Sequence, residues 1–301
     1  MRTFHSALAA VALLCAASVA WADSPEDAYI AARDDAIKVL KEKSASHPDS
    51  KDLPAQEQKL RAGLQVQLQQ IIDPGVPAGF SGPPTMNPDT LFADDEGAGA
   101  LDGLNFAAAK ASSGSLLVTT EGLLTRWLQA HKDVWKDQPN PPADAPSAFA
   151  SQDFYTQAVS DDAAVSIFAS VPIHQPAGAS AAVALLVEQS QDLAVYPPDR
   201  LAVSVVKGGK VYIAIVDTKK FPPLAACSAI WNGFKAKAAA AFAKYRASGL
   251  KDEKSFDART EFEKQGETAF HQCWAERVGK EPAFAALTQQ AQAVADAFAA
   301  Q

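Results

Sequence analysis

Cys227 and Cys273 are the residues whose spacing carries the most specific chemistry in this sequence. Each lies 23 residues from Leu250, which falls in a polar loop over residues 248–253. If the flanking segments are helices folded back on each other at that loop, the two sulfur atoms lie level, which is the condition for a disulfide. In the chain-entropy model, a bridge closing a loop of about 47 residues stabilises the folded state by on the order of 4 kcal/mol.

The two cysteines also have an alternative chemistry, because thiolates bind metals and take part in redox reactions. His271 lies two positions from Cys273. Residues two apart on a helix point about 200° from each other, so these two side chains cannot face the same ion. The sequence holds no second pair of zinc-type ligands. We therefore predict a structural disulfide between Cys227 and Cys273, with no metal site and no cofactor.

Glu267 and His271 are four residues apart and would share one face of a helix. An acid that orients an imidazole is the arrangement used in general base catalysis. The same spacing also gives an ordinary surface pair on any exposed helix. Because no nucleophile or metal motif completes the arrangement, we assign these residues no catalytic role.

Ser204 and Lys207 match the Ser-x-x-Lys spacing of penicillin-recognising enzymes. That chemistry needs both side chains on one face at the start of a helix. Here the pair falls in a predicted strand, where an odd separation sends the two side chains to opposite faces. The match is therefore interpreted as a coincidence.

A Gly-rich segment carries several carboxylates that could hold calcium, namely Asp94, Asp95, Glu96 and Asp102. Their order is not that of an EF-hand loop, which needs acids at alternate positions, a central glycine and a distant glutamate. We expect a solvated acidic loop instead.

The tryptophans beyond the N-terminal segment are Trp127, Trp135, Trp231 and Trp274. Exposed tryptophan can stack on sugar rings, which would suit a partner in a cell wall. Three of the four lie on or beside apolar helical stripes, where packing in the core is the default. His131 lies on such a stripe as well and is expected to be packed rather than to bind a ligand.

The first 22 residues have the layout of a secretory signal peptide. Arg2 supplies the positive charge, residues 7–20 form an apolar run, and a small-x-small cleavage site ends at Ala22. We predict cleavage after Ala22, no transmembrane segment afterwards, and a periplasmic or extracellular (secreted) protein. Export would remove Cys15 and leave the other two cysteines in an oxidising compartment, where a disulfide persists.

The remaining chain divides by composition and period. Residues 23–72 carry two helical stripes separated by a polar stretch, which predicts an N-terminal helical hairpin. Residues 73–90 are dense in Pro and Gly, cannot hold a helix or a central strand, and are interpreted as a linker or an extended strap. Residues 91–301 are predicted to form an α+β core with C-terminal helices. Residues 23–301 can also form one globular unit.

Four runs in the middle of the chain alternate between apolar and polar residues, as β-strands do. They cover residues 165–171, 183–187, 201–205 and 211–215. Their connections are too short for a crossover helix, so we predict an antiparallel meander with a two-residue turn at Gly208 and Gly209. Two short strands (101–107 and 115–119) and an amphipathic helix (121–136) are predicted before it.

Helical stripes surround both cysteines and return over residues 284–298. The predicted fold class is therefore α+β. It has a central antiparallel β-meander, an N-terminal helical hairpin and a C-terminal helical section stapled by a disulfide.

The composition narrows the function without naming it. A formal net charge of −8 argues against nucleic acid and anionic membrane surfaces, because no basic patch is available to neutralise phosphates. Nucleotide-binding and metalloprotease motifs are absent. We predict a non-catalytic exported protein that binds an envelope protein, peptide or glycan. A hydrolase or other enzyme with a site assembled from scattered residues, and a small-ligand carrier with a pocket between the sheet and the C-terminal helices, are the alternatives.

Overall fold

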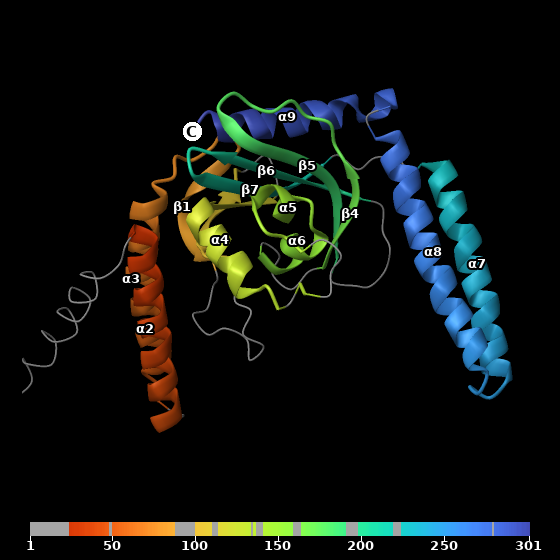
Figure 1. The fold of residues 1–301 in the computed structure, drawn as a ribbon, viewed down its shortest axis with the longest axis horizontal. Coiled ribbons are helices and arrows are strands. Elements are labelled where there is room, and N and C mark those ends of the chain that lie inside the picture. Colours follow the sequence, from red (N-terminus) through yellow and green to blue (C-terminus); the bar gives the residue numbers. More distant parts are fainter. Residues whose placement is uncertain are drawn as a thin grey trace, which may run out of the picture.

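The computed structural model describes residues 24–47, 50–87, 100–109, 114–133, 135–136, 141–158, 164–190, 198–218, 224–278 and 280–301 of the chain. Within these ranges the fold is α+β: strands form one antiparallel sheet, and helices cover it and project from it (Figure 1). The predicted fold class is confirmed, including the N-terminal helical pair and the disulfide between C-terminal helices.

In the described chain the sheet has seven strands in the order β1-β2-β3-β7-β6-β5-β4. They are β1 (Phe80–Asn87), β2 (Gly103–Ala108), β3 (Gly114–Thr120), β4 (Ala164–Ser170), β5 (Ala179–Ser190), β6 (Arg200–Lys207) and β7 (Lys210–Asp217). The predicted meander is confirmed, because β4 to β7 are consecutive in both the chain and the sheet. Gly208 and Gly209 adopt φ of 58° and 78°, the left-handed values that the predicted two-residue turn needs.

The helices fall into three groups along the chain. The first group is α2 (Pro25–Ser46) and α3 (Leu53–Ile72), which precede the sheet. The second is α4 (Glu121–Ala130), α5 (Ala145–Phe149) and α6 (Gln152–Ala158), between β3 and β4. The third is α7 (Ala225–Ala247), α8 (Glu253–Arg277), the 3-10 helix η2 (Pro282–Phe284) and α9 (Ala285–Ala299).

Helix α4 is shorter than predicted, because it ends at Ala130 rather than near residue 136. The His131 ring lies 2.7 Å from the carbonyl oxygen of Trp127 and stacks on the Trp127 ring at 4.1 Å. This contact closes the end of the helix. Trp135 then meets the edge of Trp127 at 5.6 Å after a turn, so the apolar stripe is buried although its last member is not helical.

The segment dense in Pro and Gly contributes β1, which lies at one edge of the sheet. Pro83 and Pro84 have no N–H to donate to a ladder, which restricts such a strand to an edge. Its pairing with β2 shifts register between Ser81 and Thr85, on either side of the two prolines.

The two faces of the sheet carry separate hydrophobic cores. One face packs against α9, the upper parts of α2 and α3, and the base of α8; there Phe298 stacks on Tyr212 with ring centroids 5.4 Å apart. The other face is covered by α4, α5 and α6, whose Phe149, Phe154 and Tyr155 are fully buried. The sheet is therefore covered by helices on both faces, and most of its side chains are buried.

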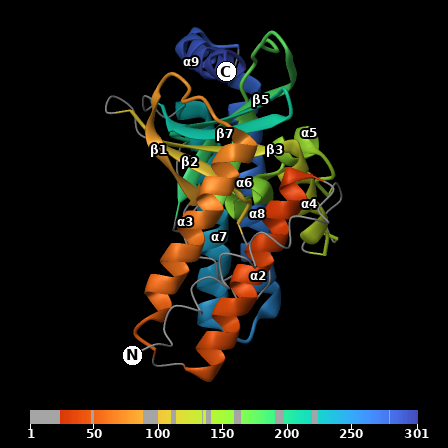
Figure 2. The same ribbon diagram turned by 90° about the vertical axis from the view of Figure 1, so that its left-hand side faces the viewer.

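Two helical pairs project from opposite ends of this body. Helices α2 and α3 form one antiparallel pair beside β1 and β2, and α7 and α8 form another beside β4. Both pairs extend in the same direction, away from α9, in two views at right angles (Figures 1 and 2). We call them the N-terminal arm (α2 and α3) and the C-terminal arm (α7 and α8).

Candidate functional site

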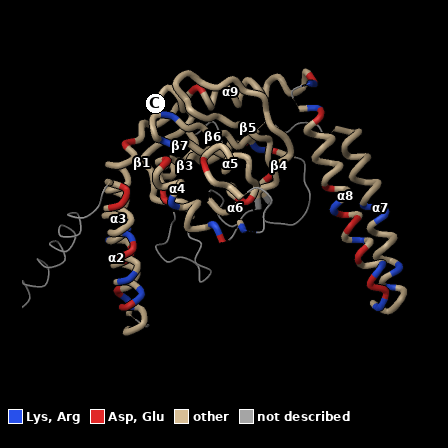
Figure 3. The backbone as a smooth tube through the Cα atoms, in the orientation of Figure 1, with Lys and Arg blue, Asp and Glu red and all other residues tan. Residues whose placement is uncertain are grey.

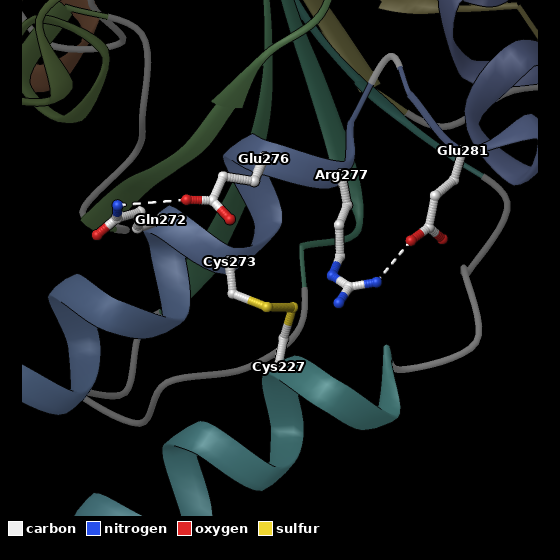
Figure 4. Close-up of a disulfide and its surroundings, with 6 residues drawn as sticks. All are labelled: Cys227, Gln272, Cys273, Glu276, Arg277 and Glu281. Carbon is white, nitrogen blue, oxygen red and sulfur yellow. Dashed lines mark hydrogen bonds and ion pairs between the residues drawn. A yellow bond between two sulfur atoms is a disulfide. The ribbon is translucent and has the colours of Figure 1, made fainter.

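The base of the C-terminal arm is closed by the predicted disulfide. Cys227 lies in the first turn of α7 and Cys273 near the end of α8, with their Cα atoms 5.6 Å apart. Both cysteines are buried. Figure 4 shows the bridge beside an ion pair between Arg277 and Glu281, which links the end of α8 to the segment that follows. The predicted pairing of Cys227 with Cys273 is confirmed.

Close packing of α7 and α8 continues from the bridge toward the far end of the arm. A Cβ atom placed on Gly266 would lie 2.7 Å from the Cβ of Phe234, so the helices meet here only because residue 266 has no side chain. On the body side of this contact, Phe270 and Trp274 pack edge-on against Phe168 of β4. The base of the arm is therefore fixed to the sheet by aromatic packing as well as to itself by a covalent bond.

The outer surface of the arm is different. Within the described chain, α7 makes extensive contact with α8 alone, whereas α8 reaches β4 at its base. The α7 side chains that face away from α8 are exposed and mostly alanine, including Ala229, Ala236, Ala240, Ala243 and Ala247. A helix of 23 residues is about 35 Å long, so the arm carries its far end well away from the sheet.

The far end of the arm is a well-defined turn rather than a loose loop. Ser248 Oγ accepts hydrogen bonds from the backbone N–H groups of Lys251 (3.1 Å) and Asp252 (2.9 Å). Asp252 in turn accepts hydrogen bonds from the N–H and hydroxyl of Ser255, which hold the pKa of its carboxyl below the usual value and cap α8. We call residues 244–256 the arm tip.

Apolar side chains are displayed at the arm tip. Leu250 is 59% exposed and Phe256 is 43% exposed, the former being the most exposed of the large hydrophobic residues described. Leu250 also has a φ of +64°, a left-handed conformation that is unfavourable for a residue with a branched side chain. Tyr245 packs against Phe256 with ring centroids 5.2 Å apart. The turn is thus built to present a leucine at its apex.

Positive charge surrounds these apolar side chains. Four cations of the arm tip are exposed: Lys244, Arg246, Lys251 and Lys254. The arm tip contains four basic and two acidic residues (Asp252 and Glu253), a net charge of +2, although the whole chain carries −8. Figure 3 shows basic positions, with acidic ones among them, along the far half of α7 and α8. The net charge of the chain therefore does not describe its C-terminal arm.

Glu267 and His271 lie near the base of this arm and form no catalytic arrangement there. The His271 ring packs on Phe168 with centroids 4.3 Å apart. Burial lowers the pKa of His271 below 6.5, and the charge of Glu267 opposes that change. The imidazole is part of the packing between α8 and β4.

Ser204 and Lys207 lie on opposite faces of β6, as predicted. Ser204 is buried, and its hydroxyl lies 2.9 Å from the hydroxyl of Tyr155 in the core beneath α6. Lys207 donates to the carbonyl oxygen of Ala299 at the end of α9, on the other face. The Ser-x-x-Lys spacing therefore has no catalytic meaning here.

Asp102 is not part of a solvated loop, and this expectation is wrong. It lies just before β2, is buried, and accepts a hydrogen bond from the hydroxyl of Tyr29 at 2.8 Å and an ion-paired hydrogen bond from Arg33. Burial raises the pKa of Asp102, while Arg33 and Tyr29 oppose that change. Asp94, Asp95 and Glu96 lie outside the described residues.

This three-residue cluster was not foreseen from the sequence. Tyr29 and Arg33 are four residues apart on α2, a spacing that places them on one helical face, but their acceptor lies about 70 residues away in the chain. The cluster joins the N-terminal arm to the sheet and has a structural role.

The tryptophans follow the packing interpretation. Trp127, Trp135 and Trp274 are buried, and Trp231 is half-buried at the interface between α7 and α8. His131 is buried against Trp127.

A hollow of about 320 Å³ lies at the end of α4, where Lys132 and Lys136 border the apolar side chains of Leu128, Trp135 and Pro142. It is remote from the interface between the sheet and the C-terminal helices, where a carrier pocket was predicted.

Comparisons of the chain with protein-family models, with curated proteins and with solved structures find no match. Across the described ranges, no three side chains of His, Cys, Asp or Glu gather as a metal site would require. In the same ranges, no helix is long and apolar enough to cross a membrane.

Proposed function

We propose that this is a non-catalytic binding protein of the cell envelope, and that it attaches to its partner through the C-terminal arm. The observation that carries the proposal is the arm itself. It extends about 35 Å from a closed body, is bridged at its base by a disulfide, and displays apolar side chains at its tip.

The packing of the arm supports a binding role. A pair of helices without a third layer buries little apolar surface, so most of its stability has to come from the one interface between the two helices. In this arm a covalent bond between Cys227 and Cys273 adds to that interface. The body already has a core on each face of the sheet that does not involve the distal part of the arm. The distal part therefore adds reach and surface rather than core.

The buried polar groups support the absence of catalysis. Catalytic acids and bases usually converge in a cleft, where their pKa values are shifted for the reaction. Among the described residues, the buried groups with shifted pKa values lie in separate packing contacts: Tyr29, Arg33 and Asp102 bond one another where α2 meets the sheet, and His271 packs on Phe168 of β4. Ser204 is bonded to a buried tyrosine. This dispersion favours binding over an enzyme with a site assembled from scattered residues.

Photo-crosslinking in the producing cell tests the proposal. A photoreactive phenylalanine analogue is introduced at Ala243, which is exposed on α7, and in a matched variant at Thr125, which is exposed on α4. We expect a discrete adduct, with protein or lipid, from position 243 and little from position 125. Adducts from position 125 alone would overturn the assignment of the arm as the binding element.

The envelope location is tested by the intact mass of the protein recovered from the cell exterior or periplasm. We expect a chain that begins at Asp23, since the predicted signal peptide ends at Ala22. A chain that keeps Met1 and stays with the cytosolic fraction would overturn the location and leave the binding role of the arm to the crosslinking experiment.

A further inference from the structure

We infer that the arm tip docks on the surface of an anionic phospholipid bilayer, with Leu250 and Phe256 entering the interface and the surrounding cations meeting the headgroups. This inference rests on the proposed role of the C-terminal arm as the binding element and names the chemistry that it binds. It depends on three features of the tip: its shape, its charge and its distance from the body.

The shape of the tip suits a surface rather than a groove. Leu250 lies in the turn between α7 and α8, and Phe256 lies one turn into α8, so both exposed side chains are at the same end of the arm. Apolar side chains at the interfacial depth of a bilayer leave water, while long cationic side chains extend back to the headgroups. The turn is held in shape by the hydroxyl of Ser248 before any partner arrives.

The charge of the tip matches an anionic surface. Lys244, Arg246, Lys251 and Lys254 are exposed around the apolar side chains. A cation held near an anionic leaflet strengthens membrane binding by about fivefold at physiological ionic strength. Asp252 and Glu253 offset part of this attraction, so the tip meets the surface with a net charge of +2. This charge together with two apolar side chains gives a reversible attachment and not a permanent anchor.

The arm tip lies far from the acidic body of the protein. The net charge of −8 opposes binding to an anionic membrane only if the acidic groups lie close to the surface that is bound. The tip lies about 35 Å from the base of the arm, whereas electrostatic interactions in water are screened within about 8 Å at physiological salt. A bilayer in contact with the tip therefore senses the cations of the tip and little of the acidic body.

An acidic protein is the other partner that such a charge would suit, and the observations favour it less. A stable protein–protein interface buries about 800 Å² on each side. The tip offers two well-exposed large apolar side chains on a convex turn, a small surface for a specific protein contact. A fluid bilayer needs no shape complementarity, so the same two side chains suffice.

Vesicle binding tests the inference with the full-length oxidised protein. The protein is mixed with vesicles of phosphatidylcholine alone, or of three parts phosphatidylcholine to one part phosphatidylglycerol, and the bound fraction is measured by flotation. We expect binding to the anionic vesicles that is lost at high sodium chloride, and at least tenfold weaker binding to the neutral ones.

Variants of the tip make the test specific. Leu250→Gly removes the apex side chain and suits the left-handed backbone, so we expect about tenfold weaker vesicle binding with no loss of thermal stability. The double change Lys251→Glu and Lys254→Glu should weaken binding more than tenfold. Val66→Ser is the matched control, because Val66 is 52% exposed on the N-terminal arm; binding should not change.

Each other outcome has a definite meaning. Absence of binding to anionic vesicles, or binding that the tip variants leave unchanged, overturns the inference. Binding to poly-L-glutamate but not to anionic vesicles assigns the tip to an acidic protein surface and overturns the lipid assignment. Either result leaves the proposed function standing if position 243 still gives a crosslinked adduct, so the two failures can be told apart.

Discussion

The two arms project in the same direction but are held in different ways (Figure 2). The N-terminal arm is joined to the body by apolar packing of α3 on the sheet and by polar side chains as well: Arg33 and Tyr29 meet Asp102, and Gln65 donates to the carbonyl oxygen of Pro84 at 2.8 Å. The C-terminal arm has a covalent bridge and an aromatic cluster at its base, and among the described elements α7 makes extensive contact with α8 alone. A projecting helical pair can thus be fixed to the body along its side or at its base.

The difference extends to the ends of the arms. The described residues at the end of the N-terminal arm include Ser46, His47 and Lys51, which are polar and exposed. The end of the C-terminal arm presents Leu250 and Phe256. An arm that is fixed only at its base has a tip that can approach another surface. The C-terminal arm is held in this way, and it is the arm with apolar side chains at its tip.

Removing the disulfide should have the largest effect and should separate the arms most clearly. For Cys227→Ser with Cys273→Ser we expect a loss of stability on the order of 4 kcal/mol, because the unfolded chain regains the freedom of the closed loop. Urea unfolding measures the loss, and hydrogen exchange should rise in α7 and α8 while α2 and α3 stay protected. Equal loss of protection in both arms would contradict the comparison; added reductant should not affect the double variant.

Breaking the polar link should have the next largest effect, on the other arm. Asp102→Ala leaves Arg33 and the buried hydroxyl of Tyr29 without their acceptor, so we expect destabilisation of about 3 kcal/mol. Asp34→Ala is the matched control, because it removes the exposed partner of the same arginine and should cost less than about 1 kcal/mol. Hydrogen exchange should rise in α2 for Asp102→Ala; a rise in α7 instead would refute the assignment.

Gly266 tests how closely the helices of the C-terminal arm must pack. Gly266→Ala would place a methyl group 2.7 Å from the Cβ of Phe234, so we expect a net destabilisation of about 1–2 kcal/mol despite the better helix propensity of alanine. Gly233 on α7 has open space around it, so Gly233→Ala should stabilise the protein by up to about 1 kcal/mol. Thermal melts of both variants measure the change in melting temperature. A higher melting temperature for both variants would show that the interface between α7 and α8 is not tightly packed at Gly266.

The smallest expected effect is a pH dependence at the base of the same arm. Burial lowers the pKa of His271 below the 6.5 of a free imidazole, so the unfolded chain takes up a proton first as the pH falls. Stability should therefore decline as the pH falls through 6.5 and level off below the lowered pKa of the folded state. His271→Asn should flatten this part of the profile of melting temperature against pH; an unchanged slope would assign the loss to other groups.

The local features of the fold were predictable from the sequence. The period-two runs gave the strands of the meander, the Gly208-Gly209 pair gave its turn, and equal spacing about Leu250 gave the disulfide. These features depend on residues close in the chain or on one symmetric turn. Their predictions are confirmed for that reason.

The long-range features were not predictable. The pairing of β3 with β7 joins segments about 100 residues apart and is not encoded in any local period. Asp102 was placed in a solvated loop, because its partners Tyr29 and Arg33 lie far away in the sequence. The net charge of −8 likewise does not describe the arm tip, because a sum over the chain has no information about which charges the fold sets apart.

The position of the disulfide makes the C-terminal arm a covalent ring, with the tip as the part of the ring farthest from the bond. A protease that cuts after the exposed Lys251 opens the ring but releases nothing, since both fragments remain joined through Cys227 and Cys273. The nicked chain runs as one species on a gel without reductant and as two with it. The arm thus keeps its two helices together after the turn that connects them has been severed.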